Sequence, residues 1–257
     1  MTARFADKTV VVTGGANGIG RATAWRLLRE GARVTVFDKV DPDSDPVRVL
    51  FDESGDHRDR LAYHSVDLTE PDQVQQTADR VLSDGPVAAL AMVAGLSQPR
   101  KKIEKVSLEE WQSFLAINLT NPFLVAQALL PSMREQRYGR IVAISSSSGR
   151  TASVWTGLPY SSAKAGVIGL IRKLAFDEGR YGITANVVAP GLAETEFVKA
   201  GLKQAPEGFL EQRLAEIPLR RGAHPDEMAA AIAFLASDDA SYVTGAVLDV
   251  NGGAFIG

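Results

Sequence analysis

A tyrosine and a lysine stand four residues apart in the segment Tyr160-Ser161-Ser162-Ala163-Lys164. Residues at i and i+4 share one face of a helix, so the Lys164 ammonium can lie near the Tyr160 phenol. A nearby positive charge favours the phenolate and lowers the pKa of a tyrosine from its ordinary value of about 10. Such a tyrosine can exchange protons near neutral pH. The spacing therefore predicts an acid/base pair, although on a solvated helix face the same two residues would have no chemical role.

A glycine-rich turn lies near the N-terminus, where residues 13–20 read TGGANGIG. Gly14 allows a tight turn, and Gly18 and Gly20 allow the backbone and the following helix to approach a pyrophosphate. The helix N-terminus adds unpaired N–H donors and the positive end of its dipole. The GxxxGxG spacing departs from the GxGxxG dinucleotide fingerprint, and a glycine-rich turn alone could be purely structural. We interpret it as one part of a dinucleotide site.

An acidic residue, Asp38, ends the next expected strand, about 20 residues beyond the glycine turn. A carboxylate at this place accepts hydrogen bonds from the ribose 2′-OH and repels a 2′-phosphate. Asn17 adds no positive charge, and Lys39 stands farther than Asp38 from the ribose position. The sequence therefore favours NAD over NADP.

Short β-rich runs alternate with helical patterns along the whole chain. Strands are expected at residues 9–12, 33–38, 63–66, 87–93, 140–145, 183–188 and 246–250, and helices at 19–30, 71–83, 108–133, 161–179, 206–216 and 225–236. This alternation predicts an α/β fold: one Rossmann-like, doubly wound parallel sheet of about seven strands in three α/β/α layers. We expect a single domain over 1–257, with a loop at the proline-containing segment 41–46. The irregular region 192–222 follows a late strand, so we expect it to form a substrate lid at the carboxyl ends of the strands.

The composition excludes several classes of protein. A net charge of -3 gives no basic surface for nucleic acid, and there is no cysteine for a disulfide, a thiolate ligand or a thiol nucleophile. The three histidines are scattered, so no metal site is expected. No stretch approaches the roughly 18 apolar residues of a membrane-spanning helix. These features predict a cytoplasmic enzyme with neither a nucleic-acid nor a membrane partner.

Further short motifs follow in a fixed order along the chain. They are Asp67-Leu68, Ala94-Gly95, Asn118, the serines 145–148, Tyr160 with Lys164, and Pro190-Gly191 with Thr195. Each is common by chance, but together with the glycine turn they resemble the short-chain dehydrogenases/reductases over essentially the whole chain. The resemblance implies a dehydrogenase or reductase that uses a nicotinamide nucleotide.

The resemblance also implies a role for each catalytic position. Tyr160 would be the general acid/base, and Lys164 would bind the nicotinamide ribose and lower the Tyr160 pKa. Ser146 would hydrogen-bond the substrate oxygen, and Asn118, in a long helix, would anchor the water of a proton relay. Because residues 145–148 are all serines, chemistry alone selects none of them. The family pattern selects Ser146, with Ser147 as the alternative.

The cofactor-binding positions implied by the resemblance surround these residues. Asp67 would bind the adenine amino group, Leu68 would pack by the ring, and the Ala193 backbone with the Thr195 hydroxyl would bind the carboxamide. The full set is Gly14, Asn17, Gly18, Ile19, Gly20, Asp38, Asp67, Leu68, Val93, Ala94, Gly95, Tyr160, Lys164, Pro190, Gly191, Ala193 and Thr195. The family commonly has Asn-Asn-Ala-Gly where this chain has Met92-Val93-Ala94-Gly95, so two polar side chains that steady the central sheet are missing.

The leading hypothesis is an NAD-dependent dehydrogenase for a secondary alcohol such as a polyol, a sugar acid or a cyclic diol. Two alternatives are a 3-oxoacyl-thioester reductase, which Asp38 disfavours because those relatives usually take NADPH, and a non-catalytic nucleotide sensor. Candidate substrate contacts are Arg100, Arg150 and Trp155, and a cationic contact would suit a carboxylated substrate. Segments 108–133 and 161–179 carry more apolar residues than one face of a sheet needs. Members of the family that the chain resembles pair these helices across two-fold axes, so the resemblance implies a homotetramer, or failing that a dimer.

Overall fold

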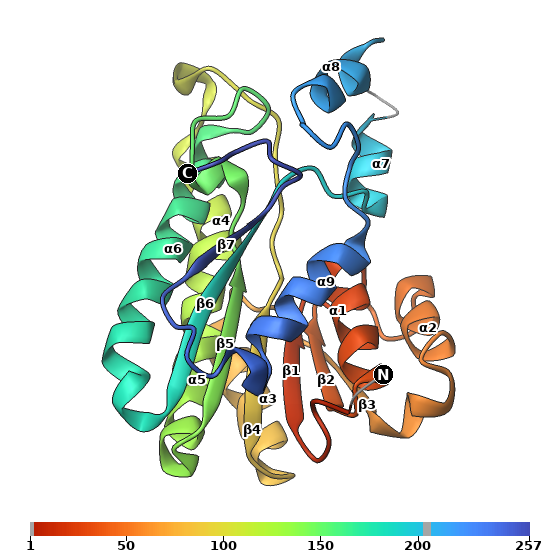
Figure 1. Ribbon diagram of the computed structural model, residues 1–257, viewed down its shortest axis with the longest axis vertical. Helices are drawn as coiled ribbons and strands as arrows, with labels where there is room; N and C mark the ends of the chain where they lie inside the picture. The colour runs from red at the N-terminus through yellow and green to blue at the C-terminus, as the bar shows by residue number, and fades with distance from the viewer. Residues whose placement is uncertain (1–2, 203–206) are drawn as a thin grey trace.

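A computed structural model describes residues 3–202 and 207–257 (Figure 1). Its seven strands form one parallel sheet in the order β3-β2-β1-β4-β5-β6-β7. They are β1 (Thr9–Thr13), β2 (Arg33–Asp38), β3 (Leu61–Ser65), β4 (Val87–Met92), β5 (Gly139–Ile144), β6 (Ile183–Pro190) and β7 (Val247–Val250). The prediction of a doubly wound parallel sheet is confirmed.

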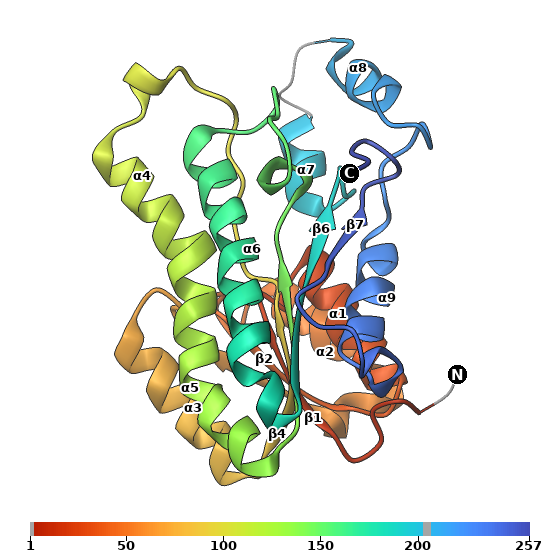
Figure 2. The same ribbon diagram turned by 60° about the vertical axis from the view of Figure 1, so that its left-hand side comes forward.

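Helices cover both faces of the sheet (Figure 2). One face carries α3 (Pro71–Ser83), α4 (Leu108–Leu115), α5 (Asn121–Gln136) and α6 (Leu158–Glu178). The other carries α1 (Gly18–Arg29), α2 (Asp45–Asp52) and α9 (Pro225–Leu235). The short helices α7 (Glu196–Leu202) and α8 (Phe209–Ala215) lie beyond the carboxyl ends of the strands (Figure 1). The three α/β/α layers are therefore as expected.

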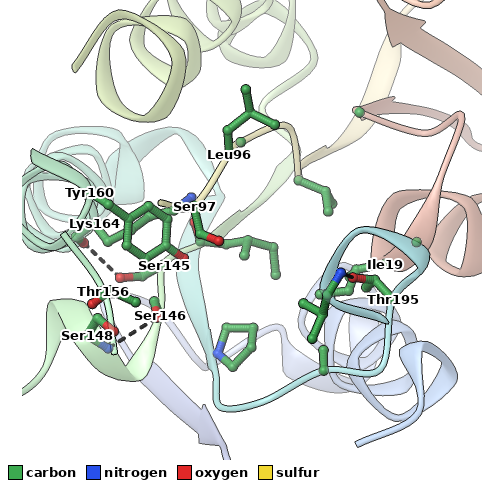
Figure 3. A pocket seen from close by; sticks show the side chains of 18 of the residues that line it. Ile19, Leu96, Ser97, Ser145, Ser146, Ser148, Thr156, Tyr160, Lys164 and Thr195 are labelled. Atoms are coloured by element: carbon green, nitrogen blue, oxygen red, sulfur yellow. Dashed lines mark hydrogen bonds between the residues drawn. The ribbon is translucent and has the colours of Figure 1, made fainter. Parts of the chain in front are cut away.

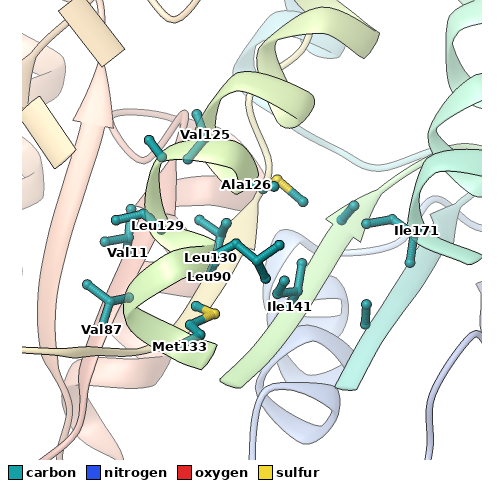
Figure 4. Packing of buried hydrophobic residues seen from close by; sticks show 14 of the residues in the cluster. Val11, Val87, Leu90, Val125, Ala126, Leu129, Leu130, Met133, Ile141 and Ile171 are labelled. Atoms are coloured by element: carbon teal, nitrogen blue, oxygen red, sulfur yellow. The ribbon is translucent and has the colours of Figure 1, made fainter. Parts of the chain in front are cut away.

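Each face of the sheet has its own hydrophobic core. Val11 of β1 packs with Leu129, Met133 and other residues of the α3, α5 and α6 side (Figure 4). Its neighbours Val10 and Val12 pack on the opposite side, in the core that includes α1 and α9. Successive strand side chains point to opposite faces, so a strand buried on both sides must be apolar at every position. This explains the unbroken apolar runs in the sequence.

Two helices differ from their expected limits, and one helix, α2, was not expected. A π-helical turn at Ala116–Thr120 separates α4 from α5, just before Pro122, which has no N–H to continue α-helical hydrogen bonding. α6 begins at Leu158, three residues early, which places Tyr160 in its first turn. The expectation of a loop over 41–46 is wrong at its end, because Asp45 and Pro46 start α2. Proline fits the first turn of a helix, and Val47 and Leu50 are buried beneath it.

The expected lid contains more helix than its composition indicated. Of the helix expected over 206–216, the structure shows α8, and Pro206 lies outside the described residues. α7 was not expected. The two ends of the region are joined, since Ala193 pairs with Ala223 in an isolated parallel bridge and the Glu194 amide donates to the Ala223 carbonyl at 2.9 Å.

By length and composition, the continuous helical segment Leu108–Gln136 could cross a membrane, contrary to the expectation that no stretch would come near that limit. In the fold, 44% of its most apolar window is buried. Val125, Leu129 and Met133 lie in the core between α5 and the sheet. The segment is a core helix of the α/β/α fold.

Candidate active site

A cavity of about 930 Å³ opens at the carboxyl ends of the strands. Every residue expected to bind the cofactor lines it, and so does Ser146. Figure 3 shows Ser146, Tyr160 and Lys164 gathered on one side, with Ile19 and Thr195 across from them. Of the predicted catalytic and cofactor-binding residues, Asn118 alone is not part of the lining.

The glycine turn brings the start of α1 to the cavity. Gly14 has a φ of +69°, and a Cβ there would lie 2.7 Å from the Ala94 Cα, so the turn packs directly on the end of β4. Asn17 is the N-cap residue of α1, yet its side chain makes no capping hydrogen bond. The first amides of this twelve-residue helix therefore lack a side-chain acceptor at a cavity wall. This cradle suits a diphosphate.

Two carboxylates stand at the adenosine end of the predicted site. Asp38 Oδ2 accepts a hydrogen bond from the Ala16 amide at 3.0 Å, and Oδ1 accepts one from the Val40 amide at 3.3 Å. Asp67 Oδ1 accepts from the Thr69 hydroxyl at 2.7 Å and from its amide at 2.9 Å. These bonds from Thr69, aided by the charge of Lys39, lower the pKa of Asp67.

The end of β4 is held by a hydroxyl. Thr13 Oγ1 accepts from the Val93 and Ala94 amides, both at 3.1 Å. These bonds tie β4 to β1 at the point where the two asparagines of the common family motif are absent. The backbone path at Val93 and Ala94 is thus kept without them.

The serines after β5 have different partners. Ser145 Oγ donates to the Lys164 carbonyl at 2.7 Å, which joins β5 to α6. Ser146 Oγ accepts from the Ser148 amide at 3.1 Å and lies close enough to Tyr160 to lower the pKa of its phenol. Ser146, and not Ser147, is therefore the serine in contact with the tyrosine.

The prediction that Lys164 lowers the pKa of Tyr160 is wrong for this structure. Lys164 Nζ donates to the Ile144 carbonyl at 2.9 Å and lies 5.8 Å from the centre of the Tyr160 ring. Burial raises the pKa of Tyr160, and the Ser146 hydroxyl opposes this only in part. Burial also lowers the pKa of Lys164, to about 8. Tyr160 therefore holds its proton at neutral pH.

Asn118 supports the site from behind. Its Nδ2 donates to the Leu96 and Phe114 carbonyls at 3.0 and 3.1 Å, and its Oδ1 accepts from the Leu96 amide at 3.2 Å. The side-chain amide therefore holds the loop after β4, which leaves the backbone carbonyl of Asn118 for the predicted relay water. The Asn118 carbonyl is better suited, since Pro122, its donor in a regular α-helix, has no N–H.

Of the candidate substrate contacts, Trp155 lines the cavity, whereas Arg100 and Arg150 do not. Arg150 is ion-paired with Asp249 at 3.2 Å and lies over the Phe255 ring. The sequence analysis missed Arg213, Glu216 and Ile217, which reach the cavity from α8 and the residues just after it. Only their position within the expected lid could have indicated them. Within the described ranges, no group of three or more acidic or histidine side chains could hold a metal ion.

Comparison with known proteins decides the family. A family model described as Enoyl-(Acyl carrier protein) reductase matches residues 14–254. The chain is a short-chain dehydrogenase/reductase. It is 38% identical over 250 residues to cis-4-hydroxycyclohexanecarboxylate dehydrogenase of Sinomonas cyclohexanicum, covering 97% of each chain. It is 34% identical to 3-oxoacyl-(acyl-carrier-protein) reductase FabG of Escherichia coli (strain K12), covering 98% of this chain and 99% of FabG.

A solved structure titled levodione reductase is also similar, with a TM-score of 0.89, 33% identity, and coverage of 97% of this chain and 98% of that one. The family resemblance inferred from the motifs is thus confirmed. Its members are oxidoreductases that act on alcohols or ketones, generally with NAD or NADP, and this oxidoreductase shares their fold.

In this short-chain dehydrogenase/reductase, an ion pair joins α7, in the region expected to form a lid, to α1, the helix that follows the glycine turn. Arg21 Nη2 of α1 lies 2.6 Å from Glu196 Oε1 of α7. Beside it, a Cβ on Gly18 would lie 3.0 Å from Thr195 Cγ2. The start of α7 therefore lies against the glycine turn, and the ion pair joins two walls of the cavity.

Glu196→Gln should speed nucleotide release about 2- to 5-fold, because a partly exposed ion pair contributes about 0.2–1 kcal/mol. Stopped-flow displacement of bound NADH measures the dissociation rate. Glu194→Gln is the matched control, since Glu194 on the same segment lies 3.9 Å from Lys199 and does not reach α1. An unchanged release rate in Glu196→Gln, or an equal increase in the control, would show that the pair does not hold the lid.

Proposed function

We propose that this enzyme is a cytoplasmic, NAD(H)-dependent dehydrogenase that interconverts a secondary alcohol and its ketone. The observation that carries the proposal is the Tyr160–Ser146 pair, which faces the same cavity as the glycine turn and Asp38. Burial keeps the phenol protonated, as a general acid for ketone reduction requires.

Each residue of the site has a separate role in the proposed reaction. The nicotinamide, when bound, supplies the hydride for reduction or takes it in oxidation. The Ser146 hydroxyl donates a hydrogen bond to the substrate oxygen, and Tyr160 gives that oxygen a proton in reduction and removes it in oxidation. Lys164, close to Gly95 and behind the phenol, is placed to bind the ribose hydroxyls. The Asn118 carbonyl is placed to hold the water that carries protons onward.

The cradle fits a dinucleotide, and Asp38 supports NAD. The Gly14–Gly20 turn and the uncapped start of α1 would hold the diphosphate, while Asp67 and Leu68 would hold the adenine. Asp38 ends β2 at the cavity, where a 2′-phosphate would meet its negative charge. Lys39 also lines the cavity, but it follows Asp38 beyond the strand end.

The similarity to cis-4-hydroxycyclohexanecarboxylate dehydrogenase supports a cyclic hydroxy acid or a related alcohol as substrate. The similarity to FabG supports the alternative, a 3-oxoacyl-thioester reductase. A screen with NAD and NADP separately, across polyols, sugar acids, cyclic hydroxy acids and 3-hydroxyacyl thioesters, tests both. We expect NAD-linked oxidation of a compound from the first three groups. Dominant NADPH-linked thioester reduction would establish the alternative, and no turnover of any compound would favour a nucleotide sensor.

We also propose that the enzyme is a homotetramer with dihedral symmetry, or failing that a dimer. Large apolar side chains are exposed on the helices of one face, among them Leu108 (65%), Phe123 (45%) and Phe176 (85%). Exposed apolar side chains grouped on neighbouring helices are typical of subunit interfaces. Light scattering at micromolar concentration should give four chain masses, and a single chain mass would contradict the prediction.

A further inference from the structure

An arginine of the lid lines the cavity without a counter-ion. Arg213 of α8 is half-buried, and its guanidinium carbon lies 5.2 Å from the centre of the Trp155 ring. Burial lowers the pKa of Arg213, and among the described residues the charge of Glu216 acts against this shift. Among the described residues, no side chain forms an ion pair or hydrogen bond with its guanidinium. A partly desolvated cation without a partner is costly unless an anion joins it.

The nearby acid is already engaged. Glu216 Oε2 accepts a hydrogen bond from the Trp155 indole at 2.8 Å, and Glu216 is exposed. The Phe209 ring packs edge-on against Trp155, with ring centres 5.0 Å apart. Three residues of the α8 region therefore hold the indole, and the indole in turn supports the guanidinium. The indole fixes the position of the guanidinium, and Glu216 acts on its charge without forming an ion pair with it.

This cation lies at the catalytic end of the cavity. Trp155 precedes Thr156, whose hydroxyl is 3.1 Å from that of Ser161, the residue after Tyr160. Figure 3 shows Thr156 beside Ser146 and Tyr160. Apolar side chains of Val154, Leu192 and Ile217 line the same cavity. A ligand with its reacting oxygen at Tyr160 would thus contact apolar residues, with Arg213 available to a negative group on its far side.

We propose that Arg213 binds a carboxylate carried by the substrate, which makes the substrate class secondary alcohols with an apolar body and a carboxylate away from the reacting carbon. The assignment rests on the proposed dehydrogenase function. A planar guanidinium presents paired N–H donors that match the two oxygens of a carboxylate, and pairing is strongest where water is partly excluded. Neutral alcohols would fit the cavity but leave Arg213 unpaired.

The first test is binding of cyclohexanecarboxylate to the enzyme–NADH complex by calorimetry. This probe has no hydroxyl, so its affinity does not depend on turnover. Arg213→Gln should weaken its binding about 30-fold or more, the scale for loss of one partner from a partly buried charge pair. Arg213→Lys should lose less affinity for cyclohexanecarboxylate, since it keeps the positive charge. Arg100→Gln, which removes an arginine outside the cavity, should bind like the unaltered enzyme.

The second test is oxidation of 4-hydroxycyclohexanecarboxylate and of its carboxamide with NAD. The ratio of kcat/KM for the acid to kcat/KM for the carboxamide should fall about 30-fold in Arg213→Gln, because KM for the acid rises. Equal binding of cyclohexanecarboxylate and cyclohexanecarboxamide, or equal losses for both in Arg213→Gln, would overturn the assignment, while oxidation of neutral alcohols would leave the proposed function intact. If cyclohexanecarboxylate binding depended on Arg213 but no alcohol were oxidised, the anion site would be supported and the proposed dehydrogenase function would be wrong.

Discussion

Tyr160→Phe should reduce turnover about 1,000-fold, within the range for loss of a general acid/base, while NADH binding changes little. Phenylalanine keeps the ring and its packing in the first turn of α6 and removes only the proton-exchanging hydroxyl. Steady-state rates on the substrate found in the screen, together with a fluorescence titration of NADH, separate the two effects. Lys164→Ala should reduce both turnover and NADH affinity, because Lys164 lies behind the phenol and at the predicted ribose site.

The neighbouring serines give a matched pair for the same mechanism. Ser146→Ala should cost about 100-fold in turnover, as for loss of one donor to a reacting oxygen. Ser147→Ala should cost little, because Ser146 is the serine whose hydroxyl acts on the Tyr160 phenol. If Tyr160→Phe kept near-normal turnover, the assignment of the whole catalytic group would be wrong.

The pH dependence follows from the same burial. Because the pKa of Tyr160 is raised, the phenol is protonated below that pKa and can act as an acid. Ketone reduction should therefore be supported at neutral pH and decline as the proton is lost at higher pH. Alcohol oxidation should rise over the same interval, since the phenolate is then the base. Initial rates in both directions, measured from neutral pH to above about pH 10, the ordinary pKa of tyrosine, test this, and a reduction rate that rises with pH while oxidation falls would contradict it.

The fold could be predicted because its signal is local and repeated. Residues 9–12 are apolar or β-branched at every position, and the structure buries Val10 and Val12 on one face and Val11 on the other. The glycine turn and Asp38 could be assigned to one site because parallel strands β1 and β2 are neighbours and end at the same edge. In such cases the order of elements along the chain determines which residues meet.

Contacts made by long side chains could not be predicted in this way. The i, i+4 spacing places Lys164 and Tyr160 on one helix face, but it does not determine that Lys164 Nζ bonds the Ile144 carbonyl. Likewise, Asn118 is in the expected helix, yet its amide turns to Leu96. Arg150 was a candidate substrate contact from the sequence and Arg213 was not, and only the fold pairs Arg150 with Asp249 and brings Arg213 to the cavity.

Asp38→Ala should narrow or invert the preference of the enzyme for NAD over NADP, which we expect to be on the order of 100-fold in kcat/KM. Two like charges about 4 Å apart repel by about 4 kcal/mol near a protein surface, which is more than enough for such a preference. The variant removes this repulsion and also the acceptor for the ribose hydroxyls, so efficiency with NADP should rise while that with NAD falls.

Asp38 also accepts hydrogen bonds from the Ala16 and Val40 amides, so its loss could disturb the glycine turn itself. Asp38→Asn separates the two effects, because an amide oxygen can still accept from Ala16 while the negative charge is gone. If charge decides the preference, Asp38→Asn should gain efficiency with NADP nearly as much as Asp38→Ala does, and lose less with NAD. Added salt should reduce the gain in catalytic efficiency with NADP only slightly in both variants. The repulsion that they remove acts over a distance shorter than the screening length of the salt.

Equal catalytic efficiency with both nucleotides in the unaltered enzyme would contradict the role given to Asp38. Lys39, which lines the same cavity, would then be the residue that offsets the carboxylate, and Lys39→Gln should restore a preference for NAD. That result would also remove the main argument against a 3-oxoacyl-thioester reductase, because the preference of those relatives for NADPH would no longer exclude this chain. The choice of nucleotide thus bears directly on the choice of substrate.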